Sequence, residues 1–141
     1  MTANEHVNAP GFVDPVGYSD ATRSGDGRRL VFLAGHVAFD KERRIVHAGD
    51  LVAQVRQTLH NLRGTLEAAG GHPEDLVKLT IHTMDVPAWR AQLGPIGAAW
   101  RDVLGRVFPA TTLLGIAELF DDGALVEIDG IAAVPIDAPS G

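Results

Sequence analysis

The sequence predicts a single α+β domain in which a mixed sheet carries two helices on one face. The 141 residues fit one domain of common size. Apolar residues recur at helical spacing over residues 51–69 and 87–104, and a segment that alternates like a strand, 76–84, lies between them. Strand-like segments also precede the first helix and follow the second. This order favours one sheet with both helices on the same side.

The composition is that of an ordinary globular protein, with 45% hydrophobic and 21% charged residues. No cysteine is present, which excludes disulfides and thiolate metal sites. No apolar run approaches the ~18 residues of a membrane span and the N-terminus lacks signal-peptide features, so we expect a cytoplasmic protein without membrane contact. Ten of the twelve basic residues are arginine, which indicates a GC-rich, bacterial genome. The net charge of −6 disfavours nucleic acid as a partner.

The N-terminal part predicts an extended arm followed by a hairpin. Residues 1–17 are interrupted by prolines and glycines, so we expect them to be extended. The segments 19–23 and 29–35 flank Gly25-Asp26-Gly27, which is typical of a hairpin turn. Residues 30–34 are apolar on both faces, which predicts a central strand, and a second turn is expected at 40–44.

The first helix has the clearest pattern in the sequence. One apolar stripe runs along residues 51–69, formed by Leu51, Val55, Leu59, Leu62 and Leu66. Asp50 is placed to cap the first free N–H groups of this helix. Gly70-Gly71 can end it in a left-handed turn.

The following segments alternate between strand and helix. In residues 76–84 one face carries Val77, Leu79 and Ile81, and the other carries Lys78, Thr80 and His82. In the second helix, Pro95 should either kink the helix or restart it from its own first turn.

Two strands, 111–118 and 124–134, are expected after the second helix, before a flexible tail at 135–141. One face of the last strand mixes apolar and acidic residues, namely Leu125, Glu127, Asp129, Ile131 and Ala133. A freely solvated face would carry fewer apolar side chains, so this pattern favours a face covered by another subunit.

Three groups of residues could carry chemistry. Glu127 and Asp129 share a strand face, so they are either an acid–base pair or two solvated surface acids. His36 and His82 are either proton carriers near neutral pH or structural histidines. Thr111 and Thr112, after Phe108-Pro109, either bind a small anion or simply begin a strand. No histidine spacing supports a metal site.

A set of short motifs occurs in a fixed order between residues 7 and 135. They are Val7-Asn8-Ala9-Pro10, Gly17-Tyr18-Ser19, Leu33-Ala34-Gly35-His36, Gln57-Thr58-Leu59-His60-Asn61-Leu62, Asp75-Leu76-Val77-Lys78-Leu79-Thr80, Phe108-Pro109-Ala110 and Val126-Glu127-Ile128-Asp129. In this set the sequence resembles the RidA/YjgF/YER057c family, also called the L-PSP endoribonuclease-like family. The resemblance implies a chorismate-mutase-like fold and a homotrimer with pockets at its subunit interfaces. It also implies hydrolysis of reactive imines and enamines to a 2-keto acid and ammonia, without metal or organic cofactor.

The resemblance also assigns the site residues. The family's tyrosine falls on Tyr18, its Ser-Gly-Gln glycine on Gly35, with His36 in place of the glutamine, and its neighbouring-subunit aromatic near Trp89. The glutamate of the last strand is Asp129 here, one methylene shorter. The expected catalytic residues are Asp129, Tyr18 and His36, and the expected substrate-binding residues are Gly35, Thr111, Thr112, Leu113, Trp89 and Glu127.

Thr111 stands where the family has the arginine that binds the substrate carboxylate. A threonine hydroxyl makes one neutral hydrogen bond, whereas a guanidinium makes a charged bidentate clamp. We therefore expect an imine or enamine hydrolase with an altered substrate, unless Arg90, Arg101 or Arg106 replaces the missing cation. The alternative is a non-catalytic metabolite-binding or regulatory trimer. A ribonuclease, suggested by the family's older name, is disfavoured by the acidic balance.

Overall fold

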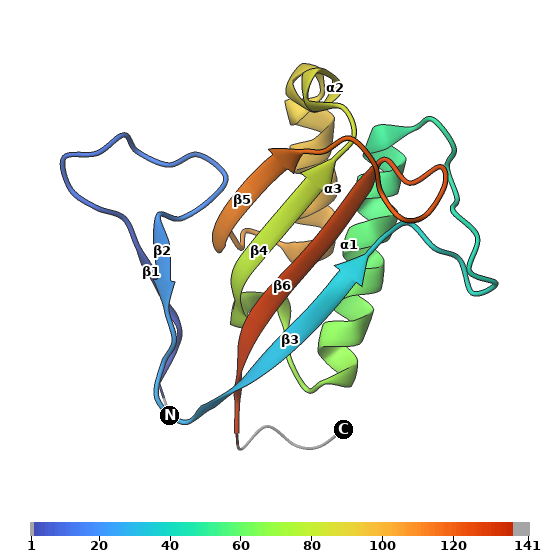
Figure 1. Cartoon of the computed structure of the whole chain (residues 1–141). Coiled ribbons are helices and arrows are strands. Elements are labelled where there is room, and N and C mark those ends of the chain that lie inside the picture. The colour runs from blue at the N-terminus through green and yellow to red at the C-terminus, as the bar shows by residue number, and fades with distance from the viewer. Residues whose placement is uncertain (1, 137–141) are drawn as a thin grey trace.

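The computed structural model describes residues 2–136 as one sheet backed by helices, with a small ribbon beside it (Figure 1). The elements in chain order are β1 (Glu5–Val7), β2 (Ala21–Arg23), β3 (Arg28–His36), α1 (Leu51–Ala68), the 3₁₀ turn η1 (Pro73–Asp75), β4 (Leu76–Thr83), α2 (Val86–Ala91), α3 (Leu93–Leu104), β5 (Ala110–Gly115) and β6 (Val126–Pro135). None of the described helices is long and apolar enough to cross a membrane.

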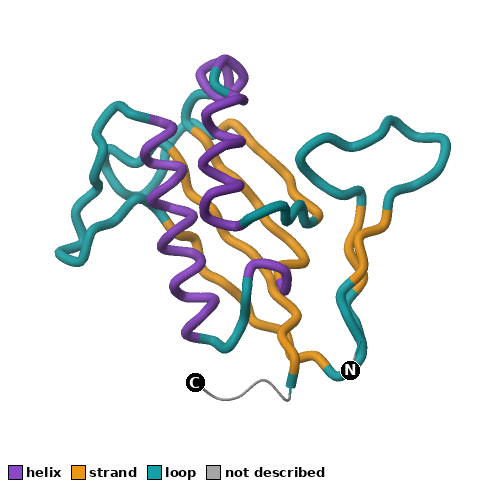
Figure 2. Tube along the Cα trace, turned by 180° about the vertical axis from the view of Figure 1, so that it is seen from behind, coloured by secondary structure: helices purple, strands orange, loops and turns teal. Residues whose placement is uncertain are grey.

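The main sheet has the strand order β3-β6-β4-β5. β4 and β5 are parallel, and β6 pairs antiparallel with both β3 and β4, so the sheet is mixed. Figure 2 shows α1 and α3 side by side on one face of the sheet. The predicted α+β architecture is therefore confirmed, and within residues 2–136 the opposite sheet face, which we call the open face, carries no helix.

The core lies between the helices and the sheet, and α1 fits its prediction closely. Its apolar stripe is buried, and Asp50 Oδ1 accepts a hydrogen bond from the Ala53 N–H at 3.1 Å. Gly70 has φ +86°, a conformation that glycine adopts without strain, and the Gly71 N–H then donates to the Leu66 carbonyl at 2.9 Å. The predicted beginning and end of this helix are thus confirmed.

The second predicted helix is divided at Gln92 into α2 and α3, and the restart at Pro95 is the alternative that the structure adopts. Pro95 lies in the first turn of α3, where its missing N–H costs nothing. Asp85 Oδ1 caps α2 by accepting from the Ala88 N–H at 2.9 Å. Trp89 of α2 and Trp100 of α3 are both buried against the core.

The predicted hairpin around Gly25-Asp26-Gly27 is wrong. β2 pairs with β1 in a separate two-stranded ribbon, and β3 pairs with β6 at the edge of the main sheet, not at its centre. β2 lies near the edge of the sheet that is formed by β5, away from β3. Two hydrogen bonds hold it there, because the Ser19 N–H donates to the Pro109 carbonyl and Thr22 Oγ1 donates to the Val77 carbonyl. The expected arm 1–17 is therefore partly a strand.

Smaller differences concern the ends and register of strands. A bulge between residues 76 and 78 turns Leu76 into the core, where Val77 was expected. β5 ends at Gly115, earlier than predicted, because its partner strand β4 ends at Thr83, the residue opposite Gly115. Of the predicted flexible tail 135–141, Pro135 belongs to β6, and 137–141 lie outside the described residues.

The turn expected at 40–44 is present and is organised by Asp40. Its Oδ1 accepts from the N–H groups of Glu42 and Arg44, each at 2.9 Å, and its Oδ2 accepts from the Arg44 side chain. These hydrogen bonds, the Arg44 backbone N–H first, hold the pKa of the Asp40 carboxyl below its ordinary value.

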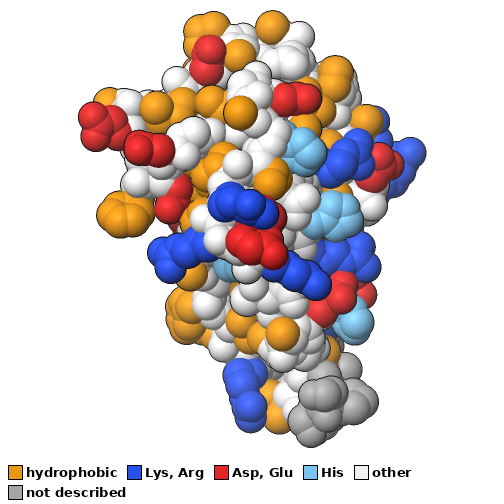
Figure 3. All heavy atoms as spheres, turned by 90° about the vertical axis from the view of Figure 1, so that its right-hand side faces the viewer, with side chains coloured by type: hydrophobic (Ala, Val, Ile, Leu, Met, Phe, Trp, Pro, Cys, Tyr) orange, Lys and Arg blue, Asp and Glu red, His pale blue; other side chains and the backbone are white. Residues whose placement is uncertain are grey.

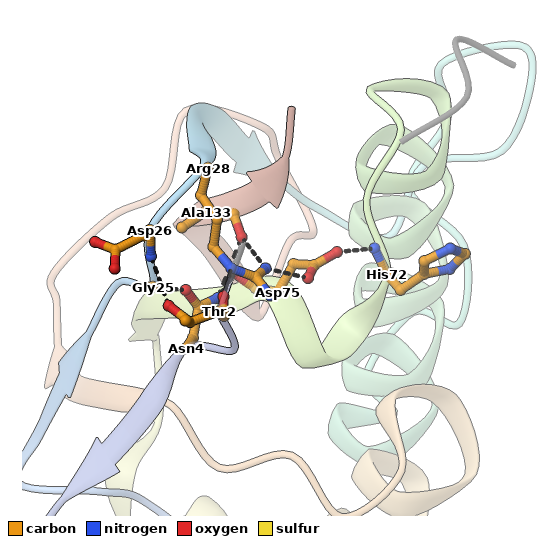
Figure 4. Close-up of polar contacts among 8 residues, drawn as sticks. All are labelled: Thr2, Asn4, Gly25, Asp26, Arg28, His72, Asp75 and Ala133. Carbon is orange, nitrogen blue, oxygen red and sulfur yellow. Dashed lines mark hydrogen bonds and ion pairs between the residues drawn. The ribbon is translucent and has the colours of Figure 1, made fainter. Parts of the chain in front are cut away.

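Arg28, at the start of β3, forms a buried ion pair with Asp75 of η1, and hydrogen bonds around this pair join the segment before β1 to the main sheet (Figure 4). Arg28 Nη1 donates to Asp75 Oδ1 at 3.0 Å and to the Ala133 carbonyl at 2.8 Å, and Nε donates to the Thr2 carbonyl at 2.7 Å. The Asn4 amide donates to the Asp75 and Ala133 carbonyls and accepts from the Gly25 N–H. The two charged side chains are only 9% and 6% exposed, so this pair is desolvated. Both Asp75 oxygens accept hydrogen bonds, Oδ2 from the His72 N–H at 2.8 Å, and Arg28 donates three.

We predict that Arg28→Met lowers the free energy of unfolding by about 3–5 kcal/mol, because it leaves the Asp75 charge buried without its partner. Arg23→Met is the control, since Arg23 of β2 also pairs with a carboxylate, that of Glu5, but in an exposed pair whose side chains are 72% and 57% exposed. It should cost less than about 1 kcal/mol. Urea unfolding of both variants measures the difference, and equal losses would contradict the proposed role of the buried pair.

Candidate functional site

The open face of the main sheet carries a polar cluster built by strand register. Thr80 lies opposite Asp129 and Thr112, and His82 lies opposite Glu127. Directly paired residues point to the same side of a sheet, so all of these side chains share the open face. We call the open-face cluster the set Lys78, Thr80, His82, Thr112, Glu127 and Asp129.

His82 lies between the main chain of Glu127 and the side chain of Asp129. Its Nδ1 is 3.3 Å from the main-chain carbonyl oxygen of Glu127 and 3.9 Å from Asp129 Oδ2. The Asp129 side chain is 41% exposed and that of His82 is 26% exposed. A solvent-accessible carboxylate beside an imidazole is an arrangement that general acid–base catalysis uses.

Gly35 lies against the Glu127 side chain. A Cβ atom added at Gly35 would lie 2.7 Å from Glu127 Oε2, so the carboxylate occupies space that a larger residue would fill. Nearby, Lys78 Nζ donates to Thr112 Oγ1 at 3.0 Å. Gly35, Glu127, Thr112 and Asp129 are therefore brought to one face.

A second group of predicted residues lines a cavity of about 700 Å³ on the helix side of the sheet. Thr111 lies opposite Leu79, whose side chain is in the core. The Thr111 side chain therefore points toward the helices, whereas that of Thr112 points to the open face. The cavity, which we call the tryptophan cavity, is lined by Val16, Gly17, Tyr18, Ile81, Trp89, Leu93, Ile96, Gly97, Trp100, Arg101, Phe108, Thr111 and Leu113. Tyr18, Trp89, Thr111 and Leu113 are thus neighbours within one chain.

His36 belongs to neither group. It lies opposite Ile128, which is buried toward the helices, so its side chain turns away from Asp129. Its Nε2 is 2.8 Å from Thr65 Oγ1 of α1, and its Nδ1 is 2.6 Å from the Ala34 carbonyl oxygen. It lines a separate cavity of about 800 Å³ together with Lys41, Asn61 and other residues of α1 and the 37–41 segment.

A single chain therefore divides the predicted site between two faces of the sheet. Asp129 and Glu127 lie on the open face, whereas Tyr18 and Thr111 lie on the helix side. The sequence pattern identified the alternating faces of 76–84, but the position of β6 beside β4 was needed to place His82 and Lys78 next to Asp129. Arg101 lies one helical turn after Gly97. The sequence offers it, with Arg90 and Arg106, as a replacement for the family's carboxylate-binding arginine, but no pattern in the sequence favours one of the three.

Among residues 2–136, no group of three or more histidine and acidic side chains is placed to hold a metal ion. The face that carries the edge of β3, α1 and the 37–49 segment mixes basic, acidic and histidine side chains, with no stripe of one sign (Figure 3). This surface lacks the basic stripe that a nucleic-acid backbone would favour.

Comparisons with known proteins agree with this fold. A family model described as Endoribonuclease L-PSP matches residues 12–134. A RutC family protein of Pyrococcus horikoshii is 30% identical over 125 residues, which is 89% of this chain and 91% of the relative. Among solved structures, the Rid family protein YyfB of Yersinia pestis has a TM-score of 0.83 at 28% identity, covering 94% of this chain and 100% of that one.

The solved structure of a Mycobacterium tuberculosis member of the YjgF/YER057c/UK114 family has a TM-score of 0.60 at 29% identity. The match covers 94% of this chain and 100% of that one. The family match spans most of the sequence, and the structural matches cover nearly all of both chains. This chain therefore belongs to the Rid/YjgF family and has its chorismate-mutase-like α+β fold.

Proposed function

We propose that this protein is a homotrimeric hydrolase of a small imine or enamine, with pockets at the subunit interfaces. Membership of the Rid/YjgF family supports a small-molecule enzyme or binding protein in general. The observation that carries the hydrolase proposal is the accessible Asp129 carboxylate with His82 Nδ1 at 3.9 Å, at the position of the family's glutamate.

Two features support the trimer. Phe32 is 73% exposed on the open face, next to the exposed Leu30 on β3, and the exposed Leu114 lies on the same face at the other edge of the sheet, on β5. A second copy covering that face would remove these apolar side chains from water. The site residues are also divided between two faces of the chain, so Asp129 can meet a bound substrate and a second set of binding residues only where two subunits join. A contact of this kind makes the site depend on assembly.

In the proposed reaction Asp129 acts as general base toward water. The water oxygen bonds to the imine carbon as Asp129 takes its proton, and the C=N electron pair moves to nitrogen, which takes a proton from protonated His82. The carbinolamine then collapses: Asp129 returns its proton to the amine, ammonia leaves, and the hydroxyl proton passes to His82 as the carbonyl forms. Both groups end in their starting protonation states. General acid–base catalysis of this kind contributes roughly 10²–10⁴-fold.

The alternative function is a metabolite-binding or regulatory trimer without turnover. It is favoured by Thr111, whose hydroxyl donates to the Pro109 carbonyl at 2.9 Å and so cannot at the same time donate to a substrate carboxylate. Tight binding of a metabolite with no product formed would support this alternative.

The test is release of ammonia and 2-keto acid from freshly generated 2-iminobutanoate and 2-iminopropanoate. Wild type and Thr111→Arg are compared at matched trimer concentration. Activity of the wild type supports the hydrolase proposal. If only Thr111→Arg is active, the pocket has the family chemistry but binds a different substrate. If both are inactive, the binding alternative is favoured over the hydrolase.

We predict that Asp129→Asn lowers kcat by about 10²–10⁴-fold, because the amide cannot take a proton from water. Glu118→Gln is the matched control: it removes a carboxylate from an exposed residue just beyond β5 and should keep wild-type kcat. Initial rates with the substrate that the test identifies, together with unfolding midpoints, separate lost catalysis from lost folding. Full turnover by Asp129→Asn would exclude this mechanism.

We predict that Phe32→Glu converts the trimer into monomers, because a charge on the open face cannot be buried without a partner. His60→Glu, on the exposed side of α1, should leave the trimer intact. Light scattering after size-exclusion chromatography should give about three times the 14.9 kDa chain mass for wild type and the control. A wild type of single-chain mass would disprove the trimer.

A further inference from the structure

The tryptophan cavity has a mostly apolar wall built from four elements of the chain. Both tryptophans of the sequence line it, Trp89 from α2 and Trp100 from α3. Ile81 and Leu113 come from the parallel pair β4 and β5, and Phe108 lies just before β5. Its volume of about 700 Å³ lies in the range of small-molecule sites, which are mostly apolar with a few polar groups.

The polar groups in this wall are few, and most are already hydrogen-bonded. Trp100 Nε1 donates to the Val107 carbonyl at 2.8 Å, and Thr111 Oγ1 donates to the Pro109 carbonyl at 2.9 Å. Arg101 is the charged residue of the lining, and no carboxylate lies beside it there. Within residues 2–136 the Arg101 guanidinium forms no ion pair, in contrast to Arg56 and Arg63 on the neighbouring helix.

Gly97 lets the Arg101 side chain lie back along α3. A Cβ atom added at Gly97 would lie 3.3 Å from Arg101 Nη1, so the guanidinium passes close over this glycine. Gly97 itself lines the cavity, one turn of α3 before Arg101. The cation therefore lies at the rim of the cavity, where it is exposed to solvent and within reach of a bound anion.

We propose that Arg101 binds the carboxylate of a substrate whose bulky apolar side chain, of the size of an aromatic ring, fills the tryptophan cavity. In this chain the cation that binds the carboxylate would then come from α3, and not from the β5 position that Thr111 occupies. A guanidinium against a carboxylate forms charge-assisted, bidentate hydrogen bonds, and aromatic walls favour a flat apolar body. This inference names the substrate class for the proposed hydrolase and rests on that function for the reaction, but not for binding.

The test uses the intrinsic fluorescence of Trp89 and Trp100 in the full-length protein. The probe is 3-phenylpropionate, compared with its neutral amide, 3-phenylpropionamide, and with acetate, which lacks the ring. We expect the carboxylate with the ring to bind at least about tenfold more tightly than either, because the amide cannot form charge-assisted hydrogen bonds and acetate has no ring to fill the cavity.

Arg101→Met should weaken binding of 3-phenylpropionate by at least about tenfold and leave binding of the amide unchanged. Arg106→Met is the matched control, because Arg106 is an exposed arginine just after α3 that does not line the cavity, and it should bind as wild type does. Gly97→Val keeps the charge of Arg101 but displaces its guanidinium, so it should weaken binding of 3-phenylpropionate more than binding of 3-phenylpropionamide.

The proposal is overturned by equal affinity for acid and amide, by wild-type binding in Arg101→Met, or by the absence of saturable binding to wild type. These outcomes are distinguishable from failure of the hydrolase proposal. Binding that depends on Arg101 without ammonia release from any imine contradicts only the reaction. Ammonia release from 2-iminobutanoate without ring-dependent binding contradicts only the substrate class.

Discussion

The buried ion pair of Arg28 and Asp75 fixes how four separate parts of the chain meet. Arg28 begins β3, Asp75 ends the 3₁₀ turn before β4, Ala133 belongs to β6, and Thr2 begins the N-terminal segment. Taking two charges out of water is costly, and the cost is offset only when each charge has complete hydrogen bonding. The geometry of all four segments is therefore constrained together, because a shift in any of them would leave a buried charge without a partner.

The ribbon anchored by this pair in turn positions one wall of the tryptophan cavity. At the far end of the ribbon, Ser19 Oγ donates to the Phe108 carbonyl at 2.7 Å, and His6 Nδ1 lies 2.8 Å from the same hydroxyl oxygen. Tyr18, adjacent to Ser19, is thereby held over Phe108 and Thr111. The ion pair beside the start of β3 and the Ser19 hydroxyl beside the start of β5 thus connect the N-terminal segment to the binding site.

The sequence predicted the elements whose signals are local and missed those that depend on distant partners. The cap at Asp50 and the turn at Gly70 are decided by neighbouring residues, so α1 was predicted nearly to its ends. The pairing of β1 with β2 was missed because Gly25-Asp26-Gly27 has the composition of a hairpin turn, whereas contacts with Pro109 and Val77 decide where β2 lies. The site residues were predicted by type, but their division between two faces follows from strand order.

The parallel pairing of β4 with β5 has a consequence for how the protein folds. The connection between these strands is α2 and α3, so the walls of the tryptophan cavity other than the Tyr18 segment come from one continuous stretch of chain, 81–113. β3, by contrast, must wait for β6, which is made last in the chain and lies between β3 and β4. Closing a short loop costs less entropy than closing a long one. The cavity-bearing unit is therefore expected to assemble first, with β6 completing the sheet afterwards and carrying Asp129 into place as a late event of folding.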